Sequence, residues 1–147
     1  MQRAEPGLAF TLVCELGFSV GVVTHRVPRL GAMVWVAEPV FENEPDAESV
    51  GRISGWRWPV LFPADAALRR RIIAPVAVID VPRRMVALPL MRSGDGTRGW
   101  RRVRLAEDGS STPMESTDDR ALPIYQIVND TRLREMIVSG WTPEQQW

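Results

Sequence analysis

Residues 7–26 read GLAFTLVCELGFSVGVVTHR and contain two apolar stretches on either side of Gly17. In the first stretch, Thr11 and Glu15 lie on one side of a period-two pattern and apolar residues on the other: Leu8, Phe10, Leu12, Cys14 and Leu16. The pattern resumes after the glycine with Phe18, Val20 and Val22. Alternation of this kind is typical of β-strands, and a glycine between two such runs marks a turn. The stretch therefore predicts a β-hairpin that turns at Gly17.

Several further segments have the composition of short strands. Residues 32–37 are apolar at adjacent positions, which is typical of a strand that is buried on both faces. Residues 93–96 (SGDG) predict a hairpin turn, and Pro89 predicts an edge position for its strand because proline cannot donate to the ladder. The remaining predicted strands are 56–62, 76–81, 85–91, 100–105 and 124–128. We expect a mainly β (α+β) fold, with about seven short strands in a small curved sheet or partly open barrel.

Two segments have helical features. Pro63 precedes a short helix predicted over 64–71, because proline is favoured at the first helical position. Asn129 or Asp130 is expected to cap a second helix, which ends at Gly140. Apolar residues on one face of this C-terminal helix predict that it docks on the sheet: Leu133, Met136 and Ile137.

The length of 147 residues predicts a single domain over 1–147. Residues 38–48 carry five acidic side chains and two prolines, which favours an exposed loop over a helix. Residues 107–119 are rich in Ser, Thr, Asp and Glu, which favours a flexible surface loop.

Composition limits the compartment and the chemistry. The single cysteine, Cys14, excludes an intrachain disulfide, and with one histidine, His25, it favours a reducing compartment. The first residues do not have the pattern of a signal peptide, and no run is long and apolar enough to span a bilayer. We therefore expect a cytoplasmic protein without a membrane partner.

The charge is segregated although the formal net charge is zero. Residues 1–51 carry a net charge of −4, residues 52–104 of +9 and residues 105–147 of −5. All 18 basic residues are arginine, a residue type that suits phosphate contacts and ion pairs at interfaces. Folding could still bring these three blocks together, so that their opposite charges cancel.

Catalytic and metal-binding patterns are weak. Cys14 and His25 form the only Cys–His pair, and Cys14 shares the apolar side of its predicted strand, as a buried structural cysteine does. The chain has no EF-hand spacing and no glycine-rich phosphate loop before a helix. We expect no metal, no cofactor and no enzymatic activity, although a pair of carboxylates brought together by folding stays open.

The order of several strand-like segments resembles the immunity protein 26 family of bacterial polymorphic-toxin systems. The resemblance covers residues 7–92 and includes the Gly17-Phe18 turn, Ser19–Val23, Met33–Ala37, Gly55–Val60 and Leu88–Met91. It implies a curved, barrel-like β domain that neutralises a cognate toxin by binding it.

These observations favour a non-catalytic protein-binding module of the immunity or antitoxin type. Carboxylates on a loop could dock on a basic toxin, and Trp and Arg are the residue types that dominate binding hot spots. The candidate contact residues are Glu42, Glu44, Asp46, Glu48, Trp58, Arg69, Arg70 and Arg71.

Two alternatives stay open. The central arginine block, with Trp56 and Trp58 on one face of their strand and Trp100 nearby, has features of a single-stranded nucleic-acid-binding surface. In a homodimer, Trp141 and Trp147 could cover an apolar seam.

Overall fold

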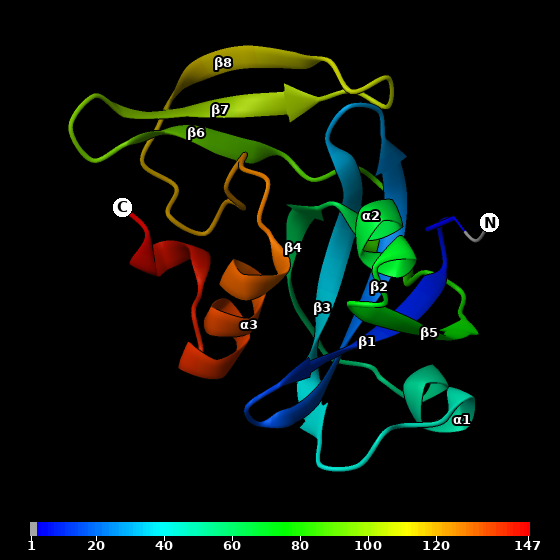
Figure 1. Ribbon diagram of the computed structural model, residues 1–147. Coiled ribbons are helices and arrows are strands. Elements are labelled where there is room, and N and C mark those ends of the chain that lie inside the picture. The colour runs from blue at the N-terminus through cyan, green and yellow to red at the C-terminus, as the bar shows by residue number, and fades with distance from the viewer. Residues whose placement is uncertain (1–2) are drawn as a thin grey trace.

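The computed structural model describes residues 3–147, which form two antiparallel β-sheets and three α-helices (Figure 1). The larger sheet has the order β4-β3-β2-β1-β5. Its strands are β1 (Leu8–Cys14), β2 (Gly17–Val27), β3 (Gly31–Phe41), β4 (Trp56–Phe62) and β5 (Ile73–Val78). The smaller sheet has the order β6-β7-β8, with strands β6 (Met91–Asp95), β7 (Gly99–Leu105) and β8 (Ser111–Thr117). The predicted mainly β class is confirmed, with two open sheets in place of one sheet or barrel.

Helices lie beside the larger sheet and at its ends. They are α1 (Ala47–Gly51), α2 (Ala64–Arg69) and α3 (Asp130–Ser139), with two 3₁₀ turns, η1 (Arg83–Met85) and η2 (Pro143–Gln145). Within the described residues, none of the helices has the length and hydropathy to cross a membrane.

The predicted hairpin is confirmed as β1 and β2, which pair from Ala9–Val22 to Cys14–Gly17. Gly17 has φ +127°, and a Cβ at this position would collide with the carbonyl oxygen of Phe41. Only glycine combines this backbone angle with so close an approach of β3. The turn therefore fixes the hairpin tip against the end of β3.

Both faces of the larger sheet are buried, which changes the meaning of the alternation in β1. On one face, Phe10 and Phe62 pack in the same cluster as Leu133 and Met136 of α3. On the other face lie Ala9, Val20, Val22 and Met85. Thr11, expected on the polar side, is only 3% exposed because this second face is also covered.

The C-terminal helix is confirmed with its predicted ends. The side chain of Asn129 accepts a hydrogen bond from the Arg132 backbone N–H at 2.8 Å, and Gly140 adopts the left-handed conformation at φ +69°. These are the usual N-cap and C-cap arrangements. The three apolar residues of its inner face are buried, and α3 packs against β1 of the larger sheet.

Trp56 and Trp58 face opposite sides of the sheet, so the prediction of a shared face is wrong. Trp56 joins the cluster with Met85, and Trp58 joins the cluster with α3. The pairing of β3 with β4 shifts between Trp35 and Ala37, so that three residue steps on β4 oppose two on β3. A β-bulge of this kind reverses the alternation of side chains.

Several predicted boundaries are also wrong. Residues 85–90 form no strand, and β6 begins only at Met91, because Pro82 and Pro89 remove backbone donors and Met85 instead closes a 3₁₀ turn and fills the core. Residues 124–128 contribute only single bridges, Arg92–Ile124 and Leu61–Ile127. The strand predicted over 76–81 is β5, which begins earlier, at Ile73, and ends earlier, at Val78; a register shift accommodates Pro75 within it.

Two predicted loops contain regular structure. The segment 107–119 includes β8, an edge strand that is mostly exposed on both faces and so has no apolar pattern. The segment 38–48 begins with the last four residues of β3, and α1 starts at Ala47 within it. The helix predicted over 64–71 ends at Arg69, since Arg71 adopts a left-handed φ of +58°.

Asp65 connects α2 to the N-terminal segment and to β2. Its carboxylate accepts hydrogen bonds from the Ala4 N–H at 2.7 Å and from two Arg26 nitrogens at 3.2 and 2.9 Å. Partial burial raises the pKa of Asp65, but the Ala4 and Arg26 hydrogen bonds outweigh it and the net pKa is lowered. The ionised form is therefore the one that stabilises the fold.

We expect Asp65→Asn to lower the melting temperature at pH 7 and to have little effect near pH 2. Because the folded-state pKa is below the unfolded value, the contribution is complete above the unfolded pKa and is lost as the pH falls through the folded one. Thermal unfolding of both proteins followed by circular dichroism at the two pH values measures this. An equal difference at both pH values would contradict an electrostatic role.

Candidate functional site

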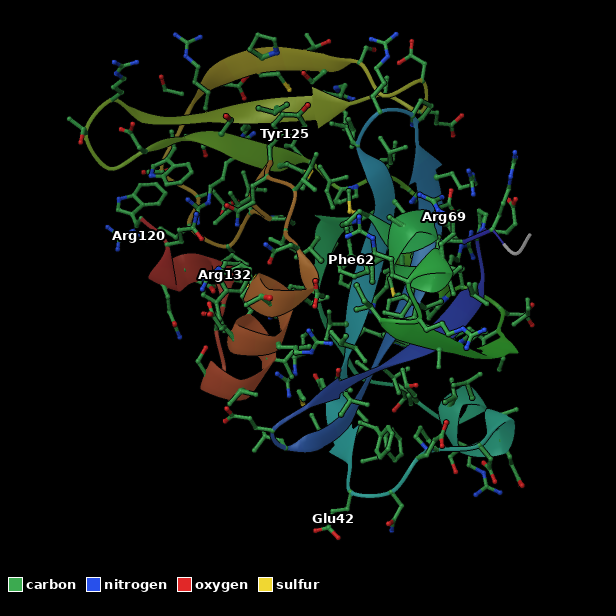
Figure 2. The ribbon with its side chains drawn as sticks, viewed as in Figure 1. Glu42, Phe62, Arg69, Arg120, Tyr125 and Arg132 are labelled. Atoms are coloured by element: carbon green, nitrogen blue, oxygen red, sulfur yellow. The ribbon has the colours of Figure 1, made fainter. Side chains whose placement is uncertain are left out.

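The acidic loop leaves the end of β3 and leads into α1. Glu42 and Glu44 are exposed, whereas Pro45 between the loop and the helix is buried and anchors it. Neither glutamate has an ion-pair partner within 4.0 Å among the described residues. Figure 2 shows Glu42 beyond the sheet, directed away from it. These two carboxylates are free to meet another molecule.

Asp46 and Glu48 have local partners on α1. The Asp46 carboxylate accepts a hydrogen bond from the Ser49 N–H at 2.8 Å, which makes Asp46 the N-cap. Hydrogen bonds from the backbone and side chain of Ser49 lower the pKa of Asp46. Glu48 pairs with Arg52 one helical turn later. Both carboxylates remain exposed.

The β1–β2 turn lies next to this loop. A Cβ on Gly17 would be 3.4 Å from the Glu42 Cα, so the hairpin tip and the acidic loop share one end of the sheet. Val13 and Leu16 at this tip are 56% and 53% exposed, and Glu15 between them is also exposed. We call this surface the acidic end; it consists of Val13, Glu15, Leu16, Glu42, Glu44, Asp46 and Glu48.

Two arginines lie near the acidic end, and each is paired with a carboxylate of the same chain. Arg52 is paired with Glu48. Arg134 donates from Nε to the Val13 carbonyl at 2.8 Å, but its guanidinium is paired with Asp130 on α3. The surface therefore keeps a clear excess of negative charge.

The arginines predicted to lie beside the acidic loop are at the other end of the sheet. Arg69, Arg70 and Arg71 are exposed at the end of α2. The helix follows Phe62, whose carbonyl oxygen adjoins Gly31 at the start of β3, whereas the loop follows Phe41 at its end. Glu42 and Arg69 lie far apart in Figure 2. The prediction of one contact surface is wrong, because the eleven residues of β3 separate its two parts.

Trp58 is mainly a packing residue. It is 4% exposed, and its Nε1 donates a hydrogen bond to the Trp141 carbonyl at 3.0 Å. The two indole rings meet edge-on with centroids 5.1 Å apart. Trp141 is only 7% exposed, so it cannot present the apolar seam predicted for a homodimer. Trp147 stacks on Trp100 of the same chain.

The aromatic part of the predicted nucleic-acid surface is also buried. Trp56 and Trp58 are each 4% exposed and Trp100 is 6% exposed. Bases stack on accessible aromatic rings, so these three tryptophans do not form a platform for them.

Cys14 and His25 do not meet. In the β2 register, Cys14 pairs with Gly17, which lies eight residues before His25. At about 3.3 Å per residue, the two side chains are more than about 20 Å apart. The His25 Nε2 lies 2.7 Å from the Val86 carbonyl oxygen and Nδ1 lies 2.9 Å from the Thr24 hydroxyl. Within residues 3–147 no three His, Cys, Asp or Glu side chains form a potential metal site.

The aliphatic residues of the acidic end were not predicted from the sequence. Leu16 continues the apolar alternation of β1, but it lies in the turn after Cys14, where the strand has ended. Its position next to the Gly17 turn was the available signal.

No protein-family model, curated protein or solved structure matches this chain, so the similarity to the immunity protein 26 family stays a prediction.

Proposed function

We propose that this chain is a non-catalytic protein-binding module whose acidic end docks on a basic surface of a partner protein. The observation that supports the proposal is the combination at one end of the sheet: two exposed aliphatic side chains at the hairpin tip, and five exposed carboxylates on the tip, on the neighbouring loop and on α1, of which Glu42 and Glu44 are unpaired within the described residues. Protein interfaces often combine an apolar centre with a polar rim.

The construction of the acidic end suits recognition. The hairpin and β3 hold the turn and the loop in place. The buried Pro45 and the Asp46 cap fix the point where the loop enters α1. A preorganised loop loses less conformational entropy when it binds. Unpaired carboxylates accelerate the encounter with a basic partner and disfavour acidic ones.

A cationic toxin is the partner class that this surface fits best. Proteins that act on nucleic acids present basic surfaces to phosphates. An acidic module that covers such a surface blocks substrate access without any catalysis of its own. Within this proposal, the chain is an immunity or antitoxin-type protein that neutralises its toxin by direct binding.

We expect the triple variant Glu42→Gln/Glu44→Gln/Asp46→Asn to bind its partner at least about 10-fold more weakly, with a melting temperature within about 2 °C of the wild type. Two of these carboxylates have no ion-pair partner within the described part of the chain, and asparagine caps a helix as well as aspartate does. The 147-residue wild-type and variant chains are immobilised, and extract of the source organism is applied at about 50 mM salt. The retained protein is then purified and titrated by calorimetry.

The control variant removes three exposed carboxylates outside the acidic end: Glu107→Gln/Asp118→Asn/Glu144→Gln. The wild type and this control should retain the same basic protein, and calorimetry should give them similar affinities that fall as salt is raised. Equal affinity for the triple variant, or retention of an acidic protein, would overturn the proposal.

A further inference from the structure

The smaller sheet carries a groove of about 460 Å³ at the opposite end of the molecule from the acidic end. Figure 2 shows Tyr125 directed from its own segment toward this sheet. None of the lining residues, all within the described part of the chain, is acidic. The polar side chains among them are Ser93, Arg98, Arg101, Ser111, Ser116 and Tyr125.

Strand pairing places three of these side chains in a row. Ser93 on β6 pairs with Arg101 on β7, which pairs with Ser116 on β8. Neighbouring strands are about 4.8 Å apart, so the row spans roughly 10 Å. Arg98 extends it into the β6–β7 turn. The groove therefore presents guanidinium and hydroxyl donors across the whole sheet.

These donors have almost no partners within residues 3–147. The side chains of Arg98 and Tyr125 make no hydrogen bond to any described residue, and Arg101 makes only a long one of 3.5 Å to the Met114 carbonyl. The nearby acids are engaged elsewhere. Asp95 accepts from the backbone N–H groups of Thr97 and Arg98, and Glu115 pairs with Arg102 at 3.3 Å.

We infer that this groove binds the phosphate backbone of a single-stranded nucleic acid. Arginine forks and hydroxyl groups are the side-chain donors that most often contact phosphates. The ring of the half-buried Tyr125 lines the same groove and offers a surface for a base. A row of donors across three strands suits a ligand with repeated phosphates better than one with a single phosphate. This second activity is independent of the acidic end.

The test measures fluorescence anisotropy of labelled dT12 and rU12 with the full chain between 50 and 200 mM salt. Arg98→Gln/Arg101→Gln is compared with Arg69→Gln/Arg70→Gln, which removes the same charge from exposed arginines outside the groove. We expect micromolar binding by the wild type at 50 mM salt. The groove variant should bind at least about 10-fold more weakly, with a salt dependence (log Kobs against log[salt]) shallower by about 1.4, whereas the control should change less than about 2-fold.

Three results would overturn the inference. The wild type could fail to bind either oligonucleotide at 50 mM salt, or the two arginine pairs could lower the affinity equally, which would indicate a general charge effect. A phosphoserine peptide could displace the oligonucleotide at equimolar concentration, which would assign the groove to single phosphates. Preference for dT12 over rU12, or the reverse, would identify which nucleic acid the groove binds and would support the inference.

Discussion

Trp58→Ala should lower the free energy of unfolding by about 3–5 kcal/mol. The indole is 4% exposed and packs between the sheet and the segment after α3. Alanine would remove this buried surface, the edge-on contact with Trp141 and the hydrogen bond to its carbonyl. Urea unfolding followed by circular dichroism measures the change.

Trp58→Phe separates the two contributions. Phenylalanine keeps much of the buried surface but leaves the Trp141 carbonyl without its donor, so we expect a smaller loss of about 1–3 kcal/mol. If Trp58→Ala lost less than about 1 kcal/mol, the side chain would not have the packing role assigned to it.

Replacing Arg92 by methionine should destabilise the fold by about 2–4 kcal/mol. Arg92 has no exposed surface, and its guanidinium donates to the carbonyls of Leu122 and Pro143. It also lies 4.1 Å from the ring centroid of Trp100 and 5.2 Å from that of Trp147. The side chain thereby joins the smaller sheet to two separate parts of the C-terminal region.

The buried positive charge of Arg92 offsets part of the stabilisation that its contacts provide. Burial lowers the pKa of Arg92, although Glu144 and Asp119 oppose the shift, and its Nη1 has no partner within the described residues. Methionine would relieve the buried charge but leave two carbonyls without donors, which is why we expect a net loss. Arg92→Lys, with a single ammonium in place of the planar fork, should also destabilise the protein. Urea unfolding checks both variants; a methionine variant as stable as the wild type would contradict the connecting role.

The elements that could be predicted from the sequence carry their signals locally. The β1–β2 hairpin has a period-two pattern and a glycine at the turn, and α3 has both of its caps and an apolar face. β8 gave no such signal, because an exposed edge strand needs no apolar residues. The opposite faces of Trp56 and Trp58 result from a bulge against β3, which depends on the pairing between strands and not on either strand alone.

The candidate site was predictable only in part for the same reason. The carboxylates of residues 42–48 are exposed as expected, because prolines and like charges keep them from the core. Their neighbours depend on topology: β4 runs back along β3 and so places Arg69 at the far end of the sheet, whereas the hairpin places Leu16 close to the acidic loop. The burial of Arg92 depends on the carbonyls of Leu122 and Pro143, which lie 30 and 51 positions later in the chain.

Hydrogen exchange of the chain with and without its purified basic partner tests most directly whether the acidic end is the surface that recognises protein. On binding we expect slower exchange of the backbone amides at residues 13–17 and 42–49, with little change in α2 and in the β6–β8 sheet. Protection confined to α2 or to the β6–β8 sheet, with exchange at the hairpin tip and the acidic loop unchanged, would contradict it.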